Sequence, residues 1–288
     1  MLEMLTLLPP PVGGQGIASG FRDAYALAWR LAILTRPSSG PYRQLLEGWC
    51  TERKQQLEKS LASTVENGRF VTESSGLKAL LRDWVLTFLH LFPAAKRFLE
   101  KGPRKDGMFR YRHRPNVAFL PQSGGFTLPQ VYCVNLGLGT VDKSVEFTDD
   151  VIFGKDKQKL FQVVVLLKSA DQYAQARDDL ANVDELSRGE LLASEATFIV
   201  HDSRSLLGDT KGLENMYRVA TAQEFAASTE LCGRRPAPEY YDEFQMMREA
   251  KGMRFLIVRP DWVVYAACKS AVELERSVVA LSELANST

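Results

Sequence analysis

The sequence has few of the residue types that build metal sites and disulfide frameworks. Its 288 residues include four cysteines and three histidines. No two cysteines form a C-x-x-C pair, and the histidines are scattered, so no cluster has the ligand spacing of a zinc site. So few cysteines indicate reduced thiols, which predicts an intracellular, cytoplasmic protein. The residues in question are Cys50, Cys133, Cys232, Cys268, His90, His113 and His201.

The sequence also lacks an excess of charge and a long apolar run. Lys+Arg number 36 and Asp+Glu number 35, so the net charge of +1 does not indicate a nucleic-acid partner. Residues 1–11 are apolar but too short to span a bilayer, and no basic region precedes them, so we expect neither a targeting signal nor a membrane span. The basic run at 104–114 has two interpretations, a solvated loop between two domains and a binding patch, and the loop is the one expected.

Three helices are expected in the first third of the chain. Apolar spacing predicts the first from Gly16 or Ser19 to Leu34, and residues 37–41, which contain two prolines and a glycine, end it. A second, amphipathic helix is predicted over 42–67 and a third over 77–99, where Pro93 kinks or divides it. We expect the aromatic residues of the third helix, such as Trp84 and Phe88, to be ordinary core.

A glycine-rich loop directly precedes the first of these helices. Gly13, Gly14 and Gly16 permit close backbone approach, and the helix that follows offers free N–H groups and the positive end of its dipole. The spacing is neither G-x-G-x-x-G nor a Walker loop. Two interpretations therefore stay open, a cradle for an anion or cofactor and a plain loop-to-helix connection.

The run from Pro10 to Ala32 reads PPxGGQGxxxGxxDAxxLAWxLA, with the group Trp49-x-x-Glu52-Arg53 in the next helix. It resembles the last flavin-binding segment of the FAD-dependent aromatic hydroxylases, the family of p-hydroxybenzoate hydroxylase and phenol hydroxylase. The Trp49 group resembles the Y-x-x-E-R of that family. One departure is Ala18, where many members carry asparagine.

The resemblance implies binding of FAD, with NAD(P)H as co-substrate, and hydroxylation of a small phenolic or related aromatic compound through a flavin hydroperoxide. It implies a substrate-proximal position for Pro10 and supporting, not catalytic, roles for Arg22 and Asp23. No catalytic residue and no metal ligand is assigned. The residues that the resemblance implies bind the cofactor are Pro11, Gly13, Gly14, Gln15, Gly16, Ile17 and Ala18. The last five of these would lie along the isoalloxazine ring.

Family members also carry an N-terminal G-x-G-x-x-G unit and a G-D-x-x-H segment before the proline pair. Residues 1–9 contain neither. We therefore expect the C-terminal part of such an enzyme, without its dinucleotide-binding unit. Two hypotheses stay open, an FAD-dependent monooxygenase that is incomplete as this chain, and a non-catalytic fragment that serves as a dimerisation or interaction module.

The rest of the chain predicts an α/β unit. Strands are expected at 161–167, 196–200, 253–258 and 262–267, with helices at 171–181 and 270–285. The order β-α-β, connector, β-β-α is that of a thioredoxin-like sheet, with a parallel pair and an antiparallel pair. Because no C-x-x-C is present, disulfide chemistry is not expected, and Cys133 and Cys268 are interpreted as buried packing residues.

This part resembles the C-terminal thioredoxin-like domain of phenol-hydroxylase-like monooxygenases, which lacks the cysteines and takes part in dimer contacts. The resemblance rests on Thr127-Leu128-Pro129-Gln130 and on the run from Leu256 to Val264, with its turn Arg259-Pro260-Asp261. The predicted fold is thus α/β, with a helical remnant of an FAD-binding domain over 1–113 and a thioredoxin-like domain over 114–288. A homodimer is the expected assembly.

Overall fold

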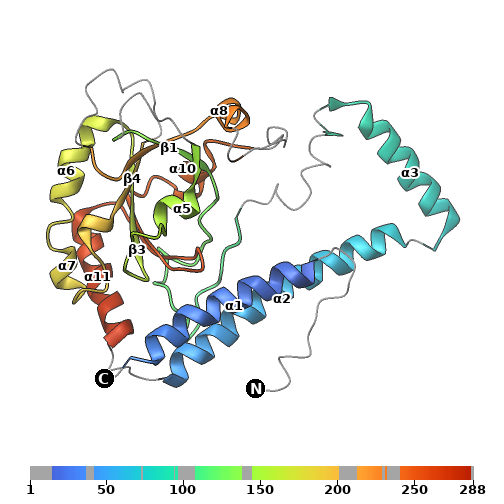
Figure 1. Ribbon diagram of the computed structural model, residues 1–288. Coiled ribbons are helices and arrows are strands. Elements are labelled where there is room, and N and C mark those ends of the chain that lie inside the picture. The colour runs from blue at the N-terminus through green and yellow to red at the C-terminus, as the bar shows by residue number, and fades with distance from the viewer. Residues whose placement is uncertain are drawn as a thin grey trace.

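The chain is a mixed α/β structure in which helices come first and a seven-stranded sheet follows (Figure 1). The computed structural model describes residues 15–36, 42–72, 74–93, 95–96, 108–137, 145–200, 213–228, 231 and 241–286. No described helix combines the length and the apolarity needed to cross a membrane.

Helices α1 (Gln15–Leu34) and α2 (Tyr42–Val71) form a long hairpin. They lie side by side and run in opposite directions (Figure 1). Helix α2 continues four residues beyond its predicted end at residue 67. Helix α3 (Gly76–His90) ends three residues before Pro93, so the proline does limit this helix.

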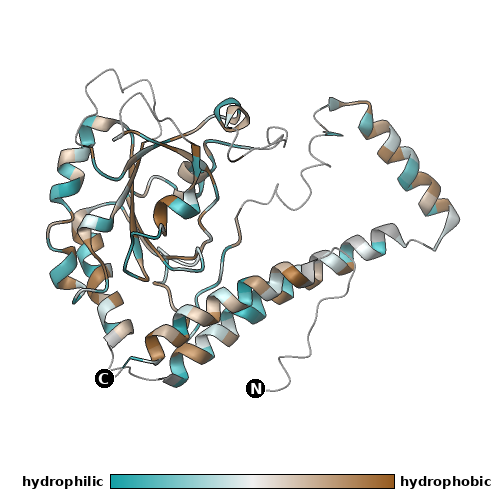
Figure 2. Ribbon diagram, viewed as in Figure 1, coloured by the Kyte–Doolittle hydropathy of each residue, from teal (hydrophilic) through white to brown (hydrophobic). Residues whose placement is uncertain are grey.

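The expectation that α3 is ordinary core is wrong. None of its residues is buried, and Trp84 and Phe88 are 73% and 53% exposed. Figure 1 shows α3 beyond the far end of α2, and Figure 2 shows apolar residues recurring along its length. The spacing of its apolar side chains correctly predicted a helix, but no described element packs against their face.

The sheet has the order β2-β1-β5-β4-β3-β6-β7. Its central pairs, β3 with β4 and β4 with β5, are parallel, whereas every other neighbouring pair is antiparallel. The strands are β1 (Tyr132–Asn135), β2 (Val145–Phe147), β3 (Gln162–Leu167), β4 (Thr197–Val200), β5 (Met216–Val219), β6 (Phe255–Val258) and β7 (Val264–Cys268).

The four predicted strands are confirmed as β3, β4, β6 and β7, and so are the parallel β3–β4 pair and the antiparallel β6–β7 hairpin. Strands β1, β2 and β5 were not predicted. They are three or four residues long, and each contains residues that are only half-buried. Such strands lack the continuous apolar run that marks β3, whose six residues are all buried.

Alternation along the strands divides the core into two layers. Val163, Val165 and Leu167 of β3 pack on one face of the sheet, and Val164 and Leu166 pack on the other. The first face is covered by α6 (Tyr173–Asp178), α7 (Val183–Leu186) and α11 (Ala271–Asn286), and the second by α5 (Thr148–Ile152) and α10 (Gln245–Ala250) (Figure 1). Helix α8 (Ala222–Ala227) caps a small third cluster beside β1 and β2.

The predicted helices at 171–181 and 270–285 are confirmed as α6 and α11, the first preceded by a 3₁₀ turn at Ala170–Gln172. A second 3₁₀ turn, Ala193–Glu195, leads into β4. Cys133 and Cys268 are buried packing residues, as expected. Trp29 and Ile33 of α1 belong to the same core as the sheet residues, so the C-terminal end of α1 packs directly on the α/β unit.

Candidate functional site: the start of helix α1 and its anchor

Part of the segment that the resemblance places along a flavin forms the start of α1. Pro10, Pro11, Gly13 and Gly14 lie outside the described residues. Gln15, Gly16, Ile17 and Ala18 form the first turn of α1, and the last two of these are exposed. No acidic residue lies in this turn. The first turn of a helix has N–H groups without an intrahelical partner, and these can donate hydrogen bonds to an anion or an electron-rich oxygen.

One turn further on, α1 is fixed to α2 by an ion pair. Nε of Arg53 lies 3.0 Å from Oδ2 of Asp23, and both side chains are largely buried. Burial raises the pKa of Asp23, while Arg53 opposes this shift. The Nε atom of Arg22 donates to the backbone oxygen of Ala18. Asp23 therefore joins α1 to α2, and Arg22 is hydrogen-bonded within α1, in agreement with the supporting roles expected for them.

A buried group of charges joins the hairpin to the sheet, with Glu52 of α2 at its centre. Oε2 of Glu52 accepts hydrogen bonds from Arg30 of α1 at 2.8 Å and from Arg259 at 2.7 Å. Oε1 accepts from a second nitrogen of Arg259 and from the backbone N–H of Ala118, both at 3.0 Å. Glu52 and Arg259 thus form a bidentate pair between the second helix and the end of β6.

Asp261 completes this group from the β6–β7 turn. Its carboxylate accepts hydrogen bonds from Nε and Nη2 of Arg259 at 2.9 and 2.5 Å, and from the indole N–H of Trp29 at 3.0 Å. The guanidinium carbons of Arg30 and Arg259 lie 4.4 and 5.0 Å from the centre of the Trp29 ring. We call Trp29, Arg30, Glu52, Arg259 and Asp261 the charge cluster.

The charge cluster is electrically balanced, since two arginines face two carboxylates. Both guanidiniums are fully buried, and the two carboxylates are at most 5% exposed. Burial alone would raise the pKa of Glu52, but Arg259 and Arg30 lower it to about 2. Glu52 is therefore ionised near neutral pH. The cluster is built to hold elements together, not to exchange protons.

The two arginines differ in their surroundings. Burial lowers the pKa of Arg30, and Glu52 partly offsets this. For Arg259, Asp261 and Glu52 outweigh burial and raise the pKa. Nε of Arg30 is buried and has no hydrogen-bond partner among the described residues. Both side chains remain protonated, because a guanidinium does not lose its proton in proteins.

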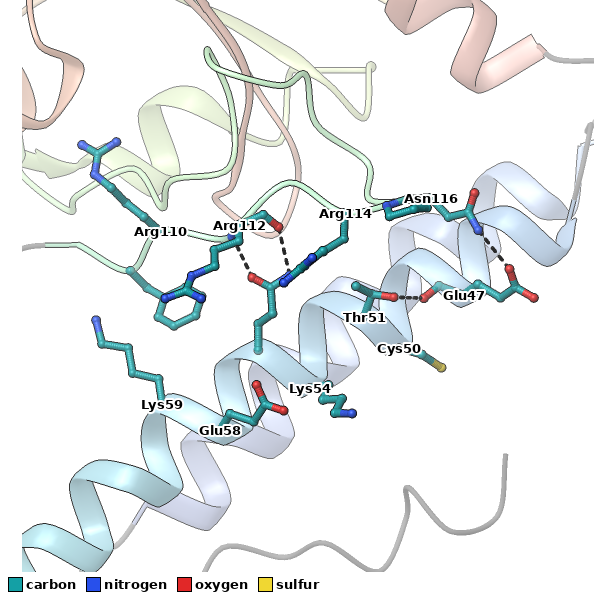
Figure 3. A pocket seen from close by; sticks show the side chains of 13 residues that line it. Glu47, Cys50, Thr51, Lys54, Glu58, Lys59, Arg110, Arg112, Arg114 and Asn116 are labelled. Carbon is teal, nitrogen blue, oxygen red and sulfur yellow. Dashed lines mark hydrogen bonds between the residues drawn. The ribbon is translucent and has the colours of Figure 1, made fainter.

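A second concave feature lies on the outer side of α2. A groove of about 950 Å³ runs between one face of α2 and the extended segment 109–116. Figure 3 shows Arg112 and Arg114 on this segment, facing Lys54, Glu58 and Lys59 on the helix. Seven of its thirteen lining residues are charged, and Phe109 is the one aromatic residue among them, so the groove differs from the aromatic-lined and aliphatic-lined sites typical of an aromatic substrate.

Two of the described cysteines, Cys133 and Cys268, are buried, and Cys50 is half-buried. Among the described residues, no three histidine, cysteine or acidic side chains gather as metal ligands. Burial raises the pKa of the Cys133 thiol to about 12 and also raises that of Cys268. Reactive cysteines need a lowered pKa, so these two are packing residues.

No protein-family model matches the chain. Over 129 residues it is 29% identical to a 3-(3-hydroxy-phenyl)propionate/3-hydroxycinnamic acid hydroxylase of Mycolicibacterium smegmatis, an alignment that covers 43% of this chain and 23% of that protein. Over 117 residues it is 32% identical to the hydroxylase of the same name from Klebsiella pneumoniae, covering 40% of this chain and 20% of the relative. The chain is similar in part to FAD-dependent aromatic hydroxylases. The matched part is less than a quarter of either relative.

Two crystal structures of flavin enzymes also align with the chain. They are the flavin-dependent monooxygenase PieE in complex with FAD and substrate, and aklavinone-11 hydroxylase with FAD and aklavinone. The alignments cover 96% and 97% of this chain and 46% and 42% of those chains, each at 15% identity and a TM-score of 0.48.

The structure unites motifs that the sequence presents separately. Trp29 lies in the glycine-loop run, Glu52 in the Trp49 group, and Arg259 and Asp261 in the strand turn of the sheet. Sequence reasoning assigned each motif to the resemblance but did not predict that their side chains meet. One signal was present, since Arg30 and Arg259 each follow an apolar run directly, where an unpaired charge would be costly.

Proposed function

We propose that this chain carries the isoalloxazine-facing segment of an FAD-dependent monooxygenase that uses NAD(P)H and hydroxylates a phenolic or related aromatic compound. The partial similarity to aromatic hydroxylases supports the reaction class. The observation that carries the proposal is the position of α1, which begins at Gln15, directly after the Gly13-Gly14 pair of the sequence, with Ile17 and Ala18 exposed in its first turn.

The residues of this turn fit the electron-rich edge of a flavin. The turn has no acidic side chain to repel negative charge, and Ile17 is 77% exposed. The backbone N–H groups from Gln15 to Ala18 would donate hydrogen bonds to the ring edge, and the helix dipole would stabilise negative charge there. FAD, when bound, would supply the activation of oxygen and its transfer to the aromatic ring.

The charge cluster anchors the helix that carries the proposed flavin-binding turn. It fixes α1 and α2 to the sheet through Glu52 and Arg259, both buried. A binding turn at the end of an anchored helix is held in one orientation, which reduces the ordering cost of binding.

We propose in addition that residues 114–288 are a thioredoxin-like domain, with 1–113 as the helical part of an FAD-binding domain. The subset β4-β3-β6-β7 supports this, because it contains the parallel β3–β4 pair and the antiparallel β6–β7 pair predicted from the sequence. With Cys133 and Cys268 both buried, the role proposed for this domain is contact in a homodimer, not thiol chemistry.

FAD titration of the purified chain tests the flavin site, with tryptophan and flavin fluorescence as readouts. Ala18→Asp is the decisive variant, because it places a negative charge where the flavin edge would bind. An acidic residue in the first turn stabilises a helix, so lost binding would not reflect unfolding. We expect at least tenfold weaker FAD binding in this variant and no change in Ala62→Asp, an equally exposed alanine of α2. Unchanged affinity of Ala18→Asp would reject the assignment.

A non-catalytic dimerisation or interaction module is the second candidate. The uncovered apolar faces support it, since Phe21 of α1 and Trp84 of α3 are 66% and 73% exposed. The same titration separates the two candidates. A chain that binds no FAD but sediments as a dimer at micromolar concentration would favour the module.

A further inference from the structure

We propose that the groove between α2 and segment 109–116 binds a small polyanion through adjacent phosphate groups. This site is separate from the start of α1 and does not depend on the proposed flavin function. Its volume of about 950 Å³ is in the range of small-molecule sites. Figure 3 shows its two walls, one face of a helix and one edge of an extended segment.

The spacing of the residues explains why the cations converge. Lys54 and Glu58 are four residues apart on α2, so they lie on the same helical face. Arg112 and Arg114 are two apart on an extended segment, a spacing that turns both toward the helix. Four cationic side chains, Lys54, Lys59, Arg112 and Arg114, therefore line one groove.

The electrostatic potential in the groove is positive because its cationic side chains outnumber its two acidic ones. One of the two acidic side chains already accepts hydrogen bonds. Glu47 accepts from Arg43 at 2.6 Å and from Asn116 at 2.9 Å at one end of the groove. Glu58 is the other acidic side chain of the lining. Among the described residues, Lys54, Arg112 and Arg114 have no ion-pair partner, so their charges are available to a ligand.

Arg110 is in a different situation. Its guanidinium lies 2.7 Å from the Glu249 carboxylate and over the Phe126 ring, and Figure 3 shows it directed away from α2. Arg110 therefore connects the segment to the α/β unit, whereas Arg112 and Arg114 line the groove.

The groove is held open by contacts that fix its two walls. The amide of Gln55 donates to the backbone oxygen of Arg112 at 3.0 Å and accepts from its N–H at 2.7 Å. At the other end the helix touches the segment so closely that a Cβ at Gly48 would lie 1.9 Å from the Asn116 oxygen. The arginines are thus presented by a fixed backbone, which limits the ordering cost of binding.

Arginine pairs favour phosphate and carboxylate oxygens, and two adjacent phosphates carry more negative charge for four cationic side chains than a single carboxylate does. The probe is inorganic pyrophosphate, with citrate as the carboxylate arm, titrated by calorimetry into the full chain at constant ionic strength. We expect pyrophosphate to bind and Arg112→Gln/Arg114→Gln to weaken it at least tenfold. Lys168→Gln/Lys269→Gln removes the same charge from exposed positions outside the groove and should retain binding.

Three results would overturn the proposal. They are no detectable heat with millimolar pyrophosphate, equal weakening in both double variants, and tighter binding of citrate than of pyrophosphate. Lys54→Gln, on the opposite wall, provides a second variant should the arginine pair prove necessary for folding. It should weaken pyrophosphate about threefold to tenfold without changing the circular dichroism spectrum.

Discussion

The sheet and the N-terminal helices place similar apolar side chains in opposite surroundings. Every residue of β3 is buried between two layers of helices. In α3, Leu77, Leu80 and Trp84 are between 67% and 85% exposed. An apolar pattern therefore determines whether a segment forms a helix or a strand. Burial of its apolar face depends on whether a second element is present to cover that face.

Helices α1 and α2 are intermediate in burial between β3 and α3. The C-terminal end of α1 is part of the sheet core through Trp29 and Ile33, whereas Ile17 and Phe21 near its start are exposed. The transition occurs along one helix. The charge cluster marks the boundary, because Arg30 and Glu52 join the covered part of the hairpin to Arg259 of the sheet.

The largest effect is expected from breaking this connection. Glu52→Gln leaves two buried guanidiniums facing one carboxylate, and removing one partner of a buried ion pair costs about 3–5 kcal/mol of unfolding free energy. Denaturant unfolding measures this loss. Hydrogen exchange should show faster exchange in α1 and α2 than in β3, because the sheet has its own core.

Glu58→Gln is the matched control for that substitution. Glu58 is exposed on the same helix, so its loss should change the unfolding free energy by no more than about 0.5 kcal/mol. Equal destabilisation by the two variants would mean that the charge cluster does not hold the hairpin to the sheet.

A pair of identical substitutions sharpens the contrast between the sheet and α3. Leu167→Ala removes a fully buried side chain of β3 and should cost about 2–5 kcal/mol. Leu80→Ala removes one that is 67% exposed in α3 and should stay within about 0.5 kcal/mol. Thermal unfolding of both variants provides the measurement. A large loss for Leu80→Ala would show that the face of α3 is covered in solution.

The smallest expected effect is a change in unfolding free energy at acidic pH. The pKa of Glu52 is lowered from 4.5 to about 2 in the folded chain, so its contribution to stability is complete above about pH 4.5 and is lost as the pH falls toward 2. The difference in unfolding free energy between the wild-type chain and Glu52→Gln should therefore narrow over that interval. A constant difference across it would contradict the ionised state assigned to Glu52.

Much of the secondary structure follows from local pattern. Strand β3 was predicted from its continuous run of apolar residues. Helices α1 and α11 were predicted from the helical spacing of theirs. Strands β1, β2 and β5 carry no such signal. They exist because neighbouring strands offer unpaired backbone groups, and this information is not local.

The candidate site divides in the same way. The sequence alone determined the glycine loop, a helix that starts near Gly16 and the partial likeness to aromatic hydroxylases, because these depend on residues adjacent along the chain. Only the tertiary structure decided that Glu52, Arg259 and Asp261 share one buried cluster and that Arg112 and Lys54 face each other across a groove. Such contacts join residues far apart in sequence, and a buried charge finds its partner only when the fold brings the two together.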